Sequence, residues 1–472
     1  MNIQKRDVSD IVEDNFMQYS VEVLTDRVIP TIQDGFKPVQ RRIMFILKNN
    51  NITKLTKSMS VTGDIAKVHP HGTTYGAIVA MVQKDNWQVP MIDGHGNFSM
   101  YASRDLQEGA DRYTEIKISD FGKKMTELIP LNVVPTESSF DGSYQLPVVI
   151  PVTFPTVLIQ SQSGIGVGFS SSTLSYNMKE VAKEVARYID KNKVFAIYPD
   201  FPTKGYIIED KAELKNSLTG GSKFTLRANI KSVDKQTIRI TEIPYGVKYE
   251  TVIDKIIKLV KEGKLKGVTD VKDLNDFNGL SIEVYTRKNA NHDELIKELF
   301  KKTPLQSNVN SNPNLIDIRD GKPAIYGLKD VVSNWVDWRL GVYRKQVERE
   351  LSEKKKQLHE LEALKIVLQD IDKTINIIRF TKKEELLSKM ENEFGFDNEQ
   401  AKYVINMKIY NINKDYIEKR IKEVDELENT VKELTTLVGN DTMLLQNIKE
   451  EVLDIADKYG VERQTKLLKE VK

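Results

Sequence analysis

Apolar residues in the last third of the chain follow the spacing of helices that pack along a seam. They alternate by four and three in three runs, which are Leu364, Leu368, Ile371, Ile375 and Ile378; Ile417, Ile421 and Val424; and Leu427, Val431, Leu434 and Val438. This repeat predicts a coiled coil. The last proline is Pro323, so proline does not interrupt a continuous helix over residues 324–472. We predict two long antiparallel helices with a small helical knob at about 381–412.

Residues 151–323 carry a mixed pattern. Period-two alternation with β-branched and aromatic residues predicts strands at Phe224–Ile230, Thr237–Ile240 and Leu280–Thr286, whereas Val252–Val260 has a helical pattern. No catalytic cluster stands out here, so we interpret this segment as a mixed α/β scaffold domain.

The first 150 residues combine short helices with loops rich in Gly, Pro and His. We predict helices at Asp10–Val28 and Arg41–Lys48. Short helices, tight turns and basic residues are typical of a winged-helix DNA reader. The predicted fold class is therefore α+β and multidomain, with domains at 1–150, 151–323 and 324–472.

Composition excludes several classes of site. The chain has 472 residues, which predicts two to four domains, and no Cys, which removes disulfides, thiolate metal sites and cysteine nucleophiles. The presence of only five His argues against a multi-histidine metal centre, and we predict no metal site in this chain. The N-terminal residues are too charged for a signal peptide and no apolar run reaches membrane-spanning length, so we expect a cytoplasmic protein that does not bind membranes.

Charge suggests a DNA-binding region only locally. Lys+Arg at 70 nearly balances Asp+Glu at 68, for a net charge of +2. Between Phe36 and Val68, however, seven Lys and Arg residues accompany the single acid Asp64. Such a stretch can neutralise phosphates, although a solvated basic face explains it equally well.

Two stretches carry candidate phosphate ligands. The turn at Asp34-Gly35 precedes a helix that starts near Pro38, and its first turn presents Lys37, Arg41 and Arg42, with Arg27 upstream. A helix N-terminus favours anions. The second stretch is H-P-H-G, in which His69 and His71 alternate along an extended segment, a spacing unlike that of a helical zinc site. We expect Thr73 or Thr74 to cap the helix that follows.

A third stretch, R-Y-T-E, places Arg112 directly before Tyr113. A phenol is a weak nucleophile near neutral pH because its ordinary pKa is about 10. Attack on a phosphodiester therefore needs a base, a metal or nearby cations, and Arg112 and Arg104 are candidates for the cations. A Tyr next to an Arg is also a common surface pair.

The fourth stretch is S-G-I-G-V-G, starting at Ser163. It lacks the G-x-G-x-x-G spacing and the Walker lysine, so nucleotide binding is excluded here. We predict an exposed turn that presents Ile165, flanked by glycines, as an apolar wedge between base steps of DNA.

Taken in order, these stretches resemble the A subunits of bacterial type IIA topoisomerases, which are the A subunit of DNA gyrase and the C subunit of topoisomerase IV with their phage-encoded relatives. The resemblance runs from about Asp7 to Tyr459. It rests on D-G-x-K-P-V-x-R-R, H-P-H-G, D-G-x-G-N-F, R-Y-T-E and S-G-I-x-V-G, with D-F-P-T at Asp200–Thr203 and T-E-I-P-Y at Thr241–Tyr245.

The resemblance implies a role for each matching position. Tyr113 is the nucleophile that forms a 5′-phosphotyrosyl link to DNA, assisted by Arg112. Ile165 intercalates and bends the cut segment. The residues implied to hold the backbone of the gate DNA are Arg27, Lys37, Arg41, Arg42, His69 and His71. The implied fold is a winged-helix domain, a tower domain and a coiled coil whose knob forms an exit gate.

The resemblance also implies partners. A double-strand break needs two tyrosines related by a twofold axis, hence a homodimer. Mg²⁺ and ATP are expected on a B-type subunit with an ATPase and a Toprim domain, giving an A₂B₂ complex that cuts double-stranded DNA and passes a second duplex through the break.

Some positions depart from the family pattern. The sequence ends at Lys472, where the A subunits of gyrase continue into a β-pinwheel, so we expect relaxation and decatenation rather than negative supercoiling. Gln40 stands where a His is usual, and the segment after Gly72 is two residues shorter than the usual bacterial form, with Gly76 where an acid is expected. Because quinolones rely on a Ser and an acid in that segment, we predict weak quinolone sensitivity. Together with the missing β-pinwheel, these departures are consistent with a phage origin.

Three other classes of function compete with this interpretation. A catalytically silent DNA-clamping protein would bind DNA without a covalent adduct, but it leaves the intact R-Y-T-E stretch unexplained. A coiled-coil scaffold leaves H-P-H-G and Ile165 without a purpose. A tyrosine recombinase would need an R…H-x-x-R pattern before a C-terminal tyrosine, and the sequence lacks one.

Overall fold

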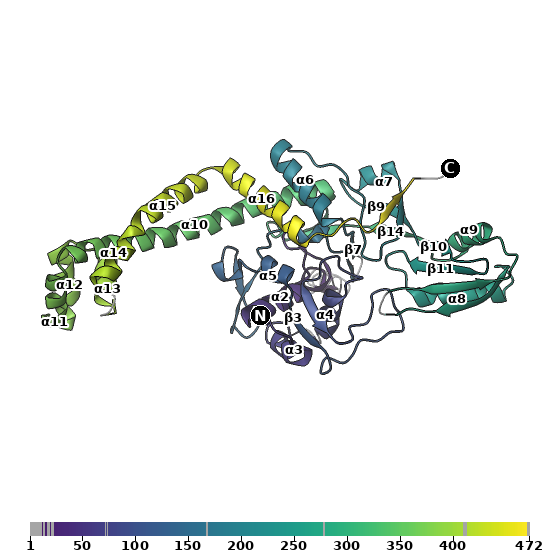
Figure 1. Ribbon diagram of the computed structural model, residues 1–472, viewed down its shortest axis with the longest axis horizontal. Helices are drawn as coiled ribbons and strands as arrows, with labels where there is room; N and C mark the ends of the chain where they lie inside the picture. Colours follow the sequence, from purple (N-terminus) through teal and green to yellow (C-terminus); the bar gives the residue numbers. More distant parts are fainter. Residues whose placement is uncertain are drawn as a thin grey trace, which may run out of the picture. The chain divides into compact units, whose positions relative to one another are not determined.

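The structure is a computed structural model that describes residues 12, 15, 16, 19, 23–70, 72, 74–166, 169–276, 279–408 and 413–469. Its internal contacts divide the chain into two compact units, which are described separately. Unit 1 comprises Met1–Arg339 with Lys449–Lys472, and unit 2 comprises Leu340–Ile448 (Figure 1). The mixture of helices and sheets agrees with the predicted α+β class.

A three-stranded antiparallel sheet and three helices form the part of unit 1 that contains most candidate residues. The sheet has the order β1-β3-β2, and its strands are β1 (Thr56–Lys57), β2 (Ile92–His95) and β3 (Glu115–Ile118). The helices are α2 (Pro38–Asn49), α3 (Ser58–Ala66) and α4 (Tyr75–Val82). The helix α2 begins at its proline because a proline at the first helical position leaves no donor without a partner.

The predicted helix over Asp10–Val28 lies largely outside the described residues. Its last turn is the π-helical segment η1 (Leu24–Val28), which buries Leu24 and Val28. Of the two predicted caps of α4, Thr74 occupies the N-cap position but makes no side-chain capping bond, and Thr73 lies outside the described residues.

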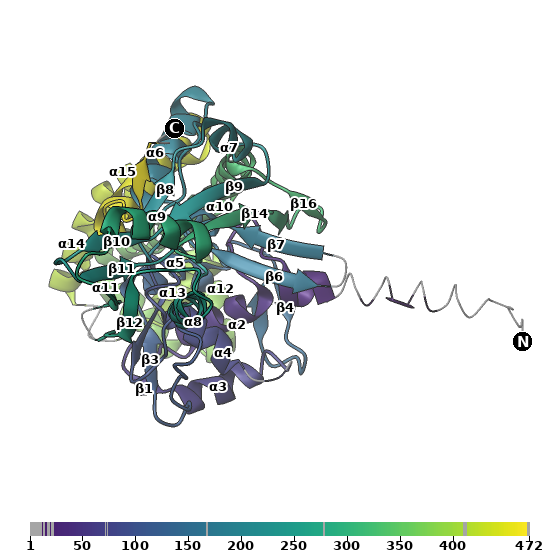
Figure 2. The same ribbon diagram turned by 90° about the vertical axis from the view of Figure 1, so that its right-hand side faces the viewer.

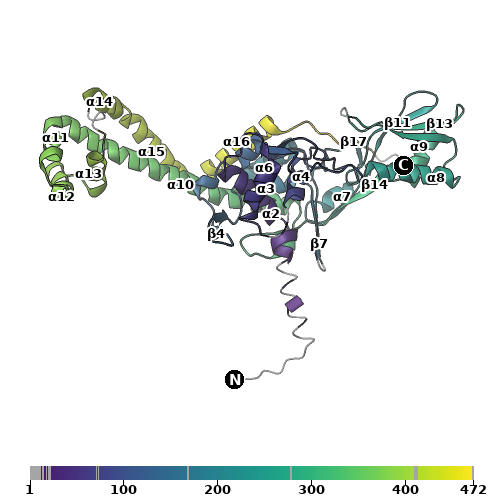
Figure 3. The same ribbon diagram turned by 90° about the horizontal axis from the view of Figure 1, so that it is seen from below.

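Two β-hairpins follow. The first pairs β4 (Thr136–Ser138) with β5 (Gln145–Pro147), and the second pairs β6 (Gln162–Gly166) with β7 (Phe169–Thr173). The prediction that Ile165 lies on a turn is wrong, because Ile165 is within β6 and pairs with Ser170. In Figures 2 and 3 both hairpins project on the side of unit 1 on which η1 lies.

Two four-stranded sheets are built from the middle of the chain, and a strand near the end of the chain joins one of them. The first has the order β10-β11-β13-β12 and the second the order β14-β9-β8-β17. The strands of the first are β10 (Asn229–Ser232), β11 (Thr237–Glu242), β12 (Val268–Asp273) and β13 (Ile282–Thr286). Those of the second are β8 (Tyr206–Ile208), β9 (Ser222–Arg227), β14 (Gln306–Ser311) and β17 (Lys466–Leu468).

The predicted strand at Phe224–Ile230 is wrong in one respect, because it is divided between two sheets. Phe224 belongs to β9 and Ile230 to β10, with Ala228 between the strands. The helices α8 (Tyr249–Lys261) and α9 (His292–Lys302) share an apolar core with the first sheet, which explains the helical pattern found at Val252–Val260.

The remaining elements of unit 1 connect these parts. They are α5 (Asp120–Met125), η2 (Ile129–Leu131), η3 (Thr156–Leu158), α6 (Met178–Lys191), α7 (Lys211–Asn216), β15 (Asn314–Ile316) and β16 (Pro323–Ile325). The helix α10 (Leu328–Gln369) begins in unit 1, and α16 (Asp441–Tyr459) ends in it.

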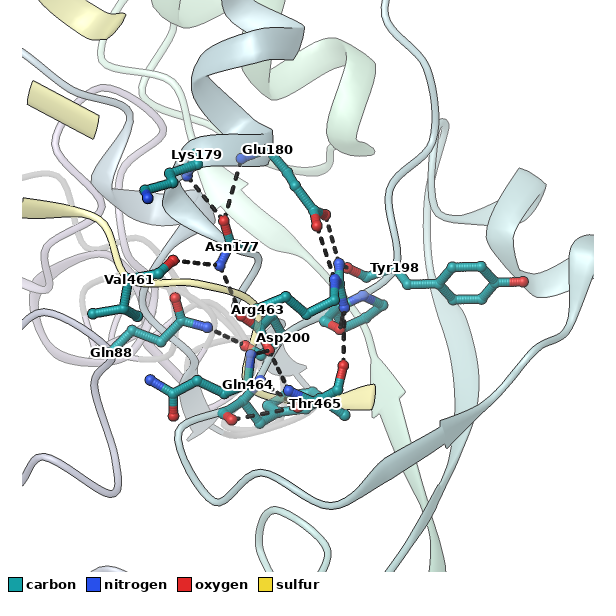
Figure 4. A network of polar contacts seen from close by, with 12 residues as sticks. Gln88, Asn177, Lys179, Glu180, Tyr198, Asp200, Val461, Arg463, Gln464 and Thr465 are labelled. Carbon is teal, nitrogen blue, oxygen red and sulfur yellow. Dashed lines mark hydrogen bonds and ion pairs between the residues drawn. The ribbon is translucent and has the colours of Figure 1, made fainter. Parts of the chain in front are cut away.

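Asp200 of the D-F-P-T motif fixes the segment that follows α16. Its carboxylate accepts from the backbone N–H groups of Gln464 at 3.0 Å and Thr465 at 2.7 Å (Figure 4). Arg463 pairs with Glu180 on α6 through two hydrogen bonds of 2.8 and 2.5 Å. The strand β17 then adds in parallel to β8, so the last described residues complete a sheet whose other strands precede them by more than a hundred residues.

Tyr245 of the T-E-I-P-Y motif packs against the D-F-P-T motif. Its ring stacks on Phe201 and on Tyr101, each at a centroid distance of 4.9 Å. Burial raises the pKa of the Tyr245 phenol well above its usual value. The two motifs therefore pack together, and this packing gives Tyr245 and Phe201 a structural role.

Unit 2 is helical in its described residues. Besides parts of α10 and α16 it contains α11 (Ile371–Phe380), α12 (Lys383–Phe394), α13 (Asn398–Ile405), α14 (Lys414–Lys422) and α15 (Val424–Val438). The helix α15 returns toward the start of unit 2 beside α10, as Figures 1 and 3 show. Consistent with this return, Asn447 donates to the hydroxyl of Tyr343 at 3.2 Å.

One predicted seam is broken in the structure. The helix α10 ends at Gln369, and Asp370 starts α11 by accepting from the backbone N–H of Lys373 at 2.9 Å. The break shifts the helical phase, so Ile375 is exposed and Ile377 is buried in its place. The prediction of one continuous helical seam through Ile378 is therefore wrong.

Candidate active site and DNA-binding surface

Tyr113 presents an accessible phenol. Its side chain is 68% exposed, and it lies in a turn closed by a hydrogen bond from its own N–H to the carbonyl of Ala110 at 2.8 Å. The guanidinium carbon of Arg112 lies 4.6 Å from the centre of the Tyr113 ring. A permanent cation is thus placed beside the phenol, where it can stabilise charge on a phosphoryl group.

The N-terminus of α3 holds the turn that carries Tyr113. The N–H of Ser58 donates to the carbonyl of Thr114 at 3.0 Å, and the N–H of Met59 donates to that of Asp111 at 3.2 Å. The Thr114 hydroxyl, which is buried, donates to Oγ of Ser58 at 2.8 Å. Helix-terminal N–H groups have no partner within their helix, and here two of them fix the backbone on either side of Tyr113.

Tyr75, the first residue of α4, holds the same turn from another direction. Its hydroxyl donates to the carbonyl of Gly109 at 2.6 Å and lies 2.8 Å from Oγ1 of Thr114. Burial raises the pKa of the Tyr75 phenol, so the hydroxyl keeps its proton. Gly109 in turn donates its N–H to the carbonyl of Asn97 at 2.8 Å.

The residues after Tyr113 enter β3, the central strand of the three-stranded sheet. Glu115 pairs across the sheet with Lys57 on one side and His95 on the other. The Lys57 ammonium also lies 3.0 Å from the Glu115 carboxylate. The nucleophile candidate is therefore an exposed side chain on a backbone that is fixed before and after it.

On α2, Arg42 contacts His69. Nη1 of Arg42 lies 2.8 Å from Nδ1 of His69, which follows α3. Because arginine only donates, Nδ1 of His69 is the acceptor and the ring proton is on Nε2. Burial lowers the pKa of the Arg42 guanidinium, although an arginine so placed keeps its charge. The structure thus brings together one residue from each predicted phosphate-binding stretch.

Arg41, in contrast, points into the protein. Its Nε donates to the Asp34 carboxylate at 2.7 Å, and its Nη2 donates to Oγ1 of Thr31 at 3.0 Å and to the carbonyl of Phe36 at 3.2 Å. Asp34 is fully buried and also accepts from the N–H of Ile150 at 2.9 Å. Arg41 therefore stabilises the turn before α2, a role that the motif alone did not predict.

Lys37 joins α2 to the hairpin that carries Ile165. Its ammonium donates to the carbonyl of Ser163 at 2.6 Å, and burial lowers its pKa. An open groove beside it is lined by polar side chains that include Gln162, Asn308 and Asn310. Arg27 lies on η1 and is exposed.

Ile165 is 87% exposed because its neighbours occupy the other face of β6. A Cβ on Gly164 would lie 2.4 Å from the carbonyl oxygen of Val28, and one on Gly166 would lie 2.5 Å from a methyl carbon of Leu24. Successive residues of a strand face opposite sides, so glycines packed against η1 direct Ile165 outward.

The remaining candidates are placed as follows. His71 lies outside the described residues. Arg104 pairs with the carboxylates of Asp105 at 2.7 Å and Asp254 at 3.1 Å, which raise its pKa, and its suggested role as a cation beside Tyr113 stays a prediction. Ser58 and Tyr75 were missed, because their partner Thr114 is 56 and 39 residues away in sequence.

Within the described part of the chain, no three His, Asp or Glu side chains are grouped so that they could hold a metal ion. In the same residues, no helix is both long and apolar enough to cross a membrane.

The exposed phenol of Tyr113 and the guanidinium of Arg112 beside it are groups suited to phosphodiester chemistry. The same unit also presents Ile165 outward on the β6–β7 hairpin. The profile of the family described as the A subunit of DNA gyrase/topoisomerase IV matches residues 27–453. The chain belongs to this family.

Bacterial members of the family are similar over almost the whole chain. The A subunit of DNA gyrase from Clostridium acetobutylicum is 32% identical over 97% of this chain and 57% of its own length. The corresponding protein of Halalkalibacterium halodurans is 31% identical over 98% of this chain and 57% of its own. That of Staphylococcus aureus strain Mu50 is 30% identical over 98% and 54%. The chain thus spans a little over half the length of the relatives it matches.

Proposed function

We propose that this chain is the DNA breakage-reunion subunit of a type IIA topoisomerase. The observation that carries the proposal is the exposed Tyr113, with Arg112 over its ring and its backbone fixed by α3 and α4, in a chain of the gyrase A family. The phenolic oxygen attacks a backbone phosphorus and forms a 5′-phosphotyrosyl ester. The 3′-oxygen leaves and takes up a proton, while the phenol loses its own.

The surface around α2 is proposed to hold the gate DNA. The contact between Arg42 and His69 supports the proposal that these two residues bind a phosphate together. Lys37 bonds to the β6–β7 hairpin, which supports the proposal that it contacts the DNA backbone next to Ile165. Arg27 is exposed on η1, beside that hairpin. The DNA contacts of Arg41 and His71 stay predictions, and for Arg41 the buried pair with Asp34 supports a structural contribution to the same surface.

Ile165 is proposed to enter between base steps and bend the duplex. The large apolar side chain of Ile165 is exposed on a strand that Lys37 and η1 hold in place, which supports this role. Unstacking one base step costs a few kcal/mol, and the contacts of a rigid side chain with the bent duplex can offset that cost.

The proposed domains follow the sequence interpretation. The β1-β3-β2 sheet with α2, α3 and α4 supports a winged-helix domain within 1–150, and the two four-stranded sheets support a tower domain within 151–323. The half-buried stripe of Leu427, Val431, Leu434 and Val438 on α15 supports a coiled coil within 324–472.

Assembly and energy source are part of the proposal. Cutting both strands requires a twofold homodimer, because one tyrosine cuts one strand. We assign Mg²⁺ and ATP to a B-type subunit in an A₂B₂ complex. Bound metal would supply charge stabilisation at the scissile phosphate, while this chain supplies the nucleophile, Arg112 and the DNA-binding surface.

A cleavage assay tests the proposal. The full chain is combined with a B-type subunit from the same organism, Mg²⁺ and supercoiled plasmid, and the reaction is stopped with detergent. Wild type is expected to give linear DNA with protein attached to its 5′ ends. The Tyr113→Phe variant should give no protein-linked DNA while still binding DNA. The control variant Tyr285→Phe, which removes a phenolic hydroxyl on β13, should cleave DNA as wild type does.

Two outcomes would contradict the proposal. DNA binding without any adduct from the wild-type chain would favour the catalytically silent clamp, and an adduct that persists in Tyr113→Phe would place the nucleophile elsewhere. With ATP, the same complex on supercoiled and on catenated plasmid checks the prediction of relaxation and decatenation, and relaxed plasmid checks for supercoiling. Efficient negative supercoiling would contradict that prediction.

A further inference from the structure

The β4–β5 hairpin presents a second exposed apolar side chain. Phe140, in the turn of this hairpin, is 88% exposed, which leaves a whole aromatic ring in solvent. Isolated apolar residues on a surface are common, but a fully projecting phenylalanine is costly to keep in water. The function proposed for Tyr113 and Ile165 does not use it.

The turn holds Phe140 in a defined position. Asp141 accepts from the hydroxyls of Ser139 at 2.8 Å and Ser143 at 2.6 Å, and from the N–H of Ser143 at 3.0 Å. The N–H of Ser139 donates to the carbonyl of Tyr144 at 2.8 Å, which closes the loop. The hydrogen bonds from Ser143 and Ser139 lower the pKa of Asp141 to about 2, so its charge and these bonds persist at any physiological pH. A preorganised anchor loses little entropy on binding.

The base of the hairpin rests on α2, the helix of the proposed DNA-binding surface. The ring of Tyr144 meets that of Phe45 edge to face at 6.2 Å, and Leu146 is buried. The β4–β5 and β6–β7 hairpins project on the same side of unit 1 (Figures 2 and 3). An occupant of Phe140 would therefore lie next to the surface that is proposed to hold DNA.

Charge argues that the occupant is a protein and not the DNA itself. From Leu128 to Ile150 the only charged residues are Glu137 and Asp141, both acidic and both close in sequence to Phe140. Asp141 next to Phe140 disfavours a phosphate backbone at the tip of the hairpin, since DNA-binding surfaces carry an excess of cations, whereas Glu137 lies close enough to Arg42 of α2 to favour the charged form of that guanidinium. A matching protein surface would offer an apolar pocket bordered by Lys or Arg side chains.

We propose that Phe140 anchors the docking of the metal-bearing B-type subunit on this chain, an inference that rests on the proposed function. That subunit has to bring its metal to the DNA held on α2, and the hairpin offers a rigid apolar contact on the same helix. The contact is made by the aromatic ring, and the carboxylates of Glu137 and Asp141 orient a cationic rim around it.

The test uses the B-type subunit that gives DNA cleavage together with the wild-type chain. Calorimetry in the absence of DNA measures the Kd between that subunit and the full chain. Phe140→Ser should raise the Kd at least about tenfold, whereas Phe140→Leu should stay within about threefold because it keeps an apolar side chain. Added salt should weaken the wild-type complex. Val233→Ser is the matched control, since Val233 is a half-exposed apolar residue at the end of the β10–β11 hairpin and its loss should leave the Kd unchanged.

The Phe140→Ser chain should also keep its homodimer and its affinity for DNA. An unchanged Kd for the B-type subunit overturns the inference. So does lost DNA affinity, which would make Phe140 a DNA contact, or a dissociated dimer, which would show that a second copy covers it. The proposed function fails separately, when the wild-type chain makes no adduct through Tyr113.

Discussion

Tyr113 combines an exposed side chain with an immobile backbone. Ser58, Met59 and Tyr75 reach the residues around it from two helices, and β3 continues from it into a sheet. A nucleophile held in this way needs little reorganisation to reach a phosphorus, which reduces the entropic part of the barrier. The residues that fix the turn should therefore affect the rate of cleavage more than the binding of DNA.

Removing the Tyr75 hydroxyl tests this expectation. Tyr75→Phe keeps the ring and deletes the donor to Gly109, so we expect cleavage to slow by about fivefold to tenfold, which corresponds to the roughly 1 kcal/mol of one hydrogen bond. Single-turnover cleavage at saturating DNA measures the rate, and a binding titration should give the wild-type Kd. A variant that weakens DNA binding but cleaves at the normal rate would show that Tyr75 acts on the surface and not on the turn.

Sequence motifs indicated the candidate groups of the site but not the residues that support them. R-Y-T-E pointed to Arg112 and Tyr113, and the structure places the guanidinium against the ring. The pair of Arg41 with buried Asp34 and the contact of Arg104 with Asp254 were not predictable, because the partners depend on how loops fold together. A motif therefore indicates which residue types are present, while tertiary packing decides which face solvent.

At the scale of elements, the β6–β7 hairpin shows how two glycines orient one isoleucine. Gly164 and Gly166 let β6 lie directly on η1, and the alternation of the strand then turns Ile165 away from the protein. The sequence predicted the exposure of Ile165 correctly but placed the residue on a turn, because glycines in a strand and in a turn look alike without the neighbouring element.

A methyl group at Gly164 should disturb this packing. Gly164→Ala places a Cβ 2.4 Å from the carbonyl oxygen of Val28, so η1 and the hairpin must separate. We expect a loss of about 1–3 kcal/mol in the free energy of unfolding, measured with urea. Gly63→Ala, in open space on α3, should instead stabilise by up to about 1 kcal/mol through helix propensity. Equal effects of the two substitutions would refute the close contact.

The helical elements of unit 2 show the limit of periodicity. The spacing of Leu364 and Ile378 fits one seam, yet Asp370 starts a new helix between them and changes which side chains face inward. An aspartate is an ordinary exposed residue within a helix and a strong cap at its start, so the apolar pattern alone could not distinguish the two.

Within unit 2, His359 on α10 predicts a pH dependence. Burial alone would lower its pKa, but contacts with the carboxylates of Asp397, at 2.5 Å before α13, and Glu362, at 3.5 Å, raise it. A raised pKa means that the contact stabilises fully below the unfolded-state value of about 6.5 and is lost as pH rises through the folded-state value. The Tm of wild type should therefore be slightly higher than that of His359→Gln at pH 6, and the two values should be equal at pH 9. A gap of equal size at both pH values would contradict this account.

At the scale of the whole molecule, residues 461–468 are part of the fold of unit 1. Asp200, which is fully buried, receives two backbone donors from this segment and a third hydrogen bond from Asn177 at 3.0 Å. These buried contacts give the D-F-P-T motif a structural role.

Asp200→Ala should therefore loosen the segment. Three buried donors would lose their acceptor, and we expect a loss of roughly 2–5 kcal/mol in the free energy of unfolding together with faster hydrogen exchange at Gln464 and Thr465. Glu462→Ala removes a largely exposed carboxylate of the same segment that pairs with Lys179, and it should change neither quantity measurably. Normal protection in Asp200→Ala would show that β17 alone retains the segment.

The route by which the chain continues from Tyr113 also has a mechanical meaning. In the proposed function a DNA end would be joined to this phenol while the two halves of a gate move apart, so tension would enter the polypeptide at the turn and run along β3. That strand lies between β1 and β2, and its hydrogen bonds to them are perpendicular to the direction of the force. Several hydrogen bonds therefore bear the force at the same time, and they do not break in sequence. An edge strand would have peeled; a central strand transmits the force to the helices beneath it.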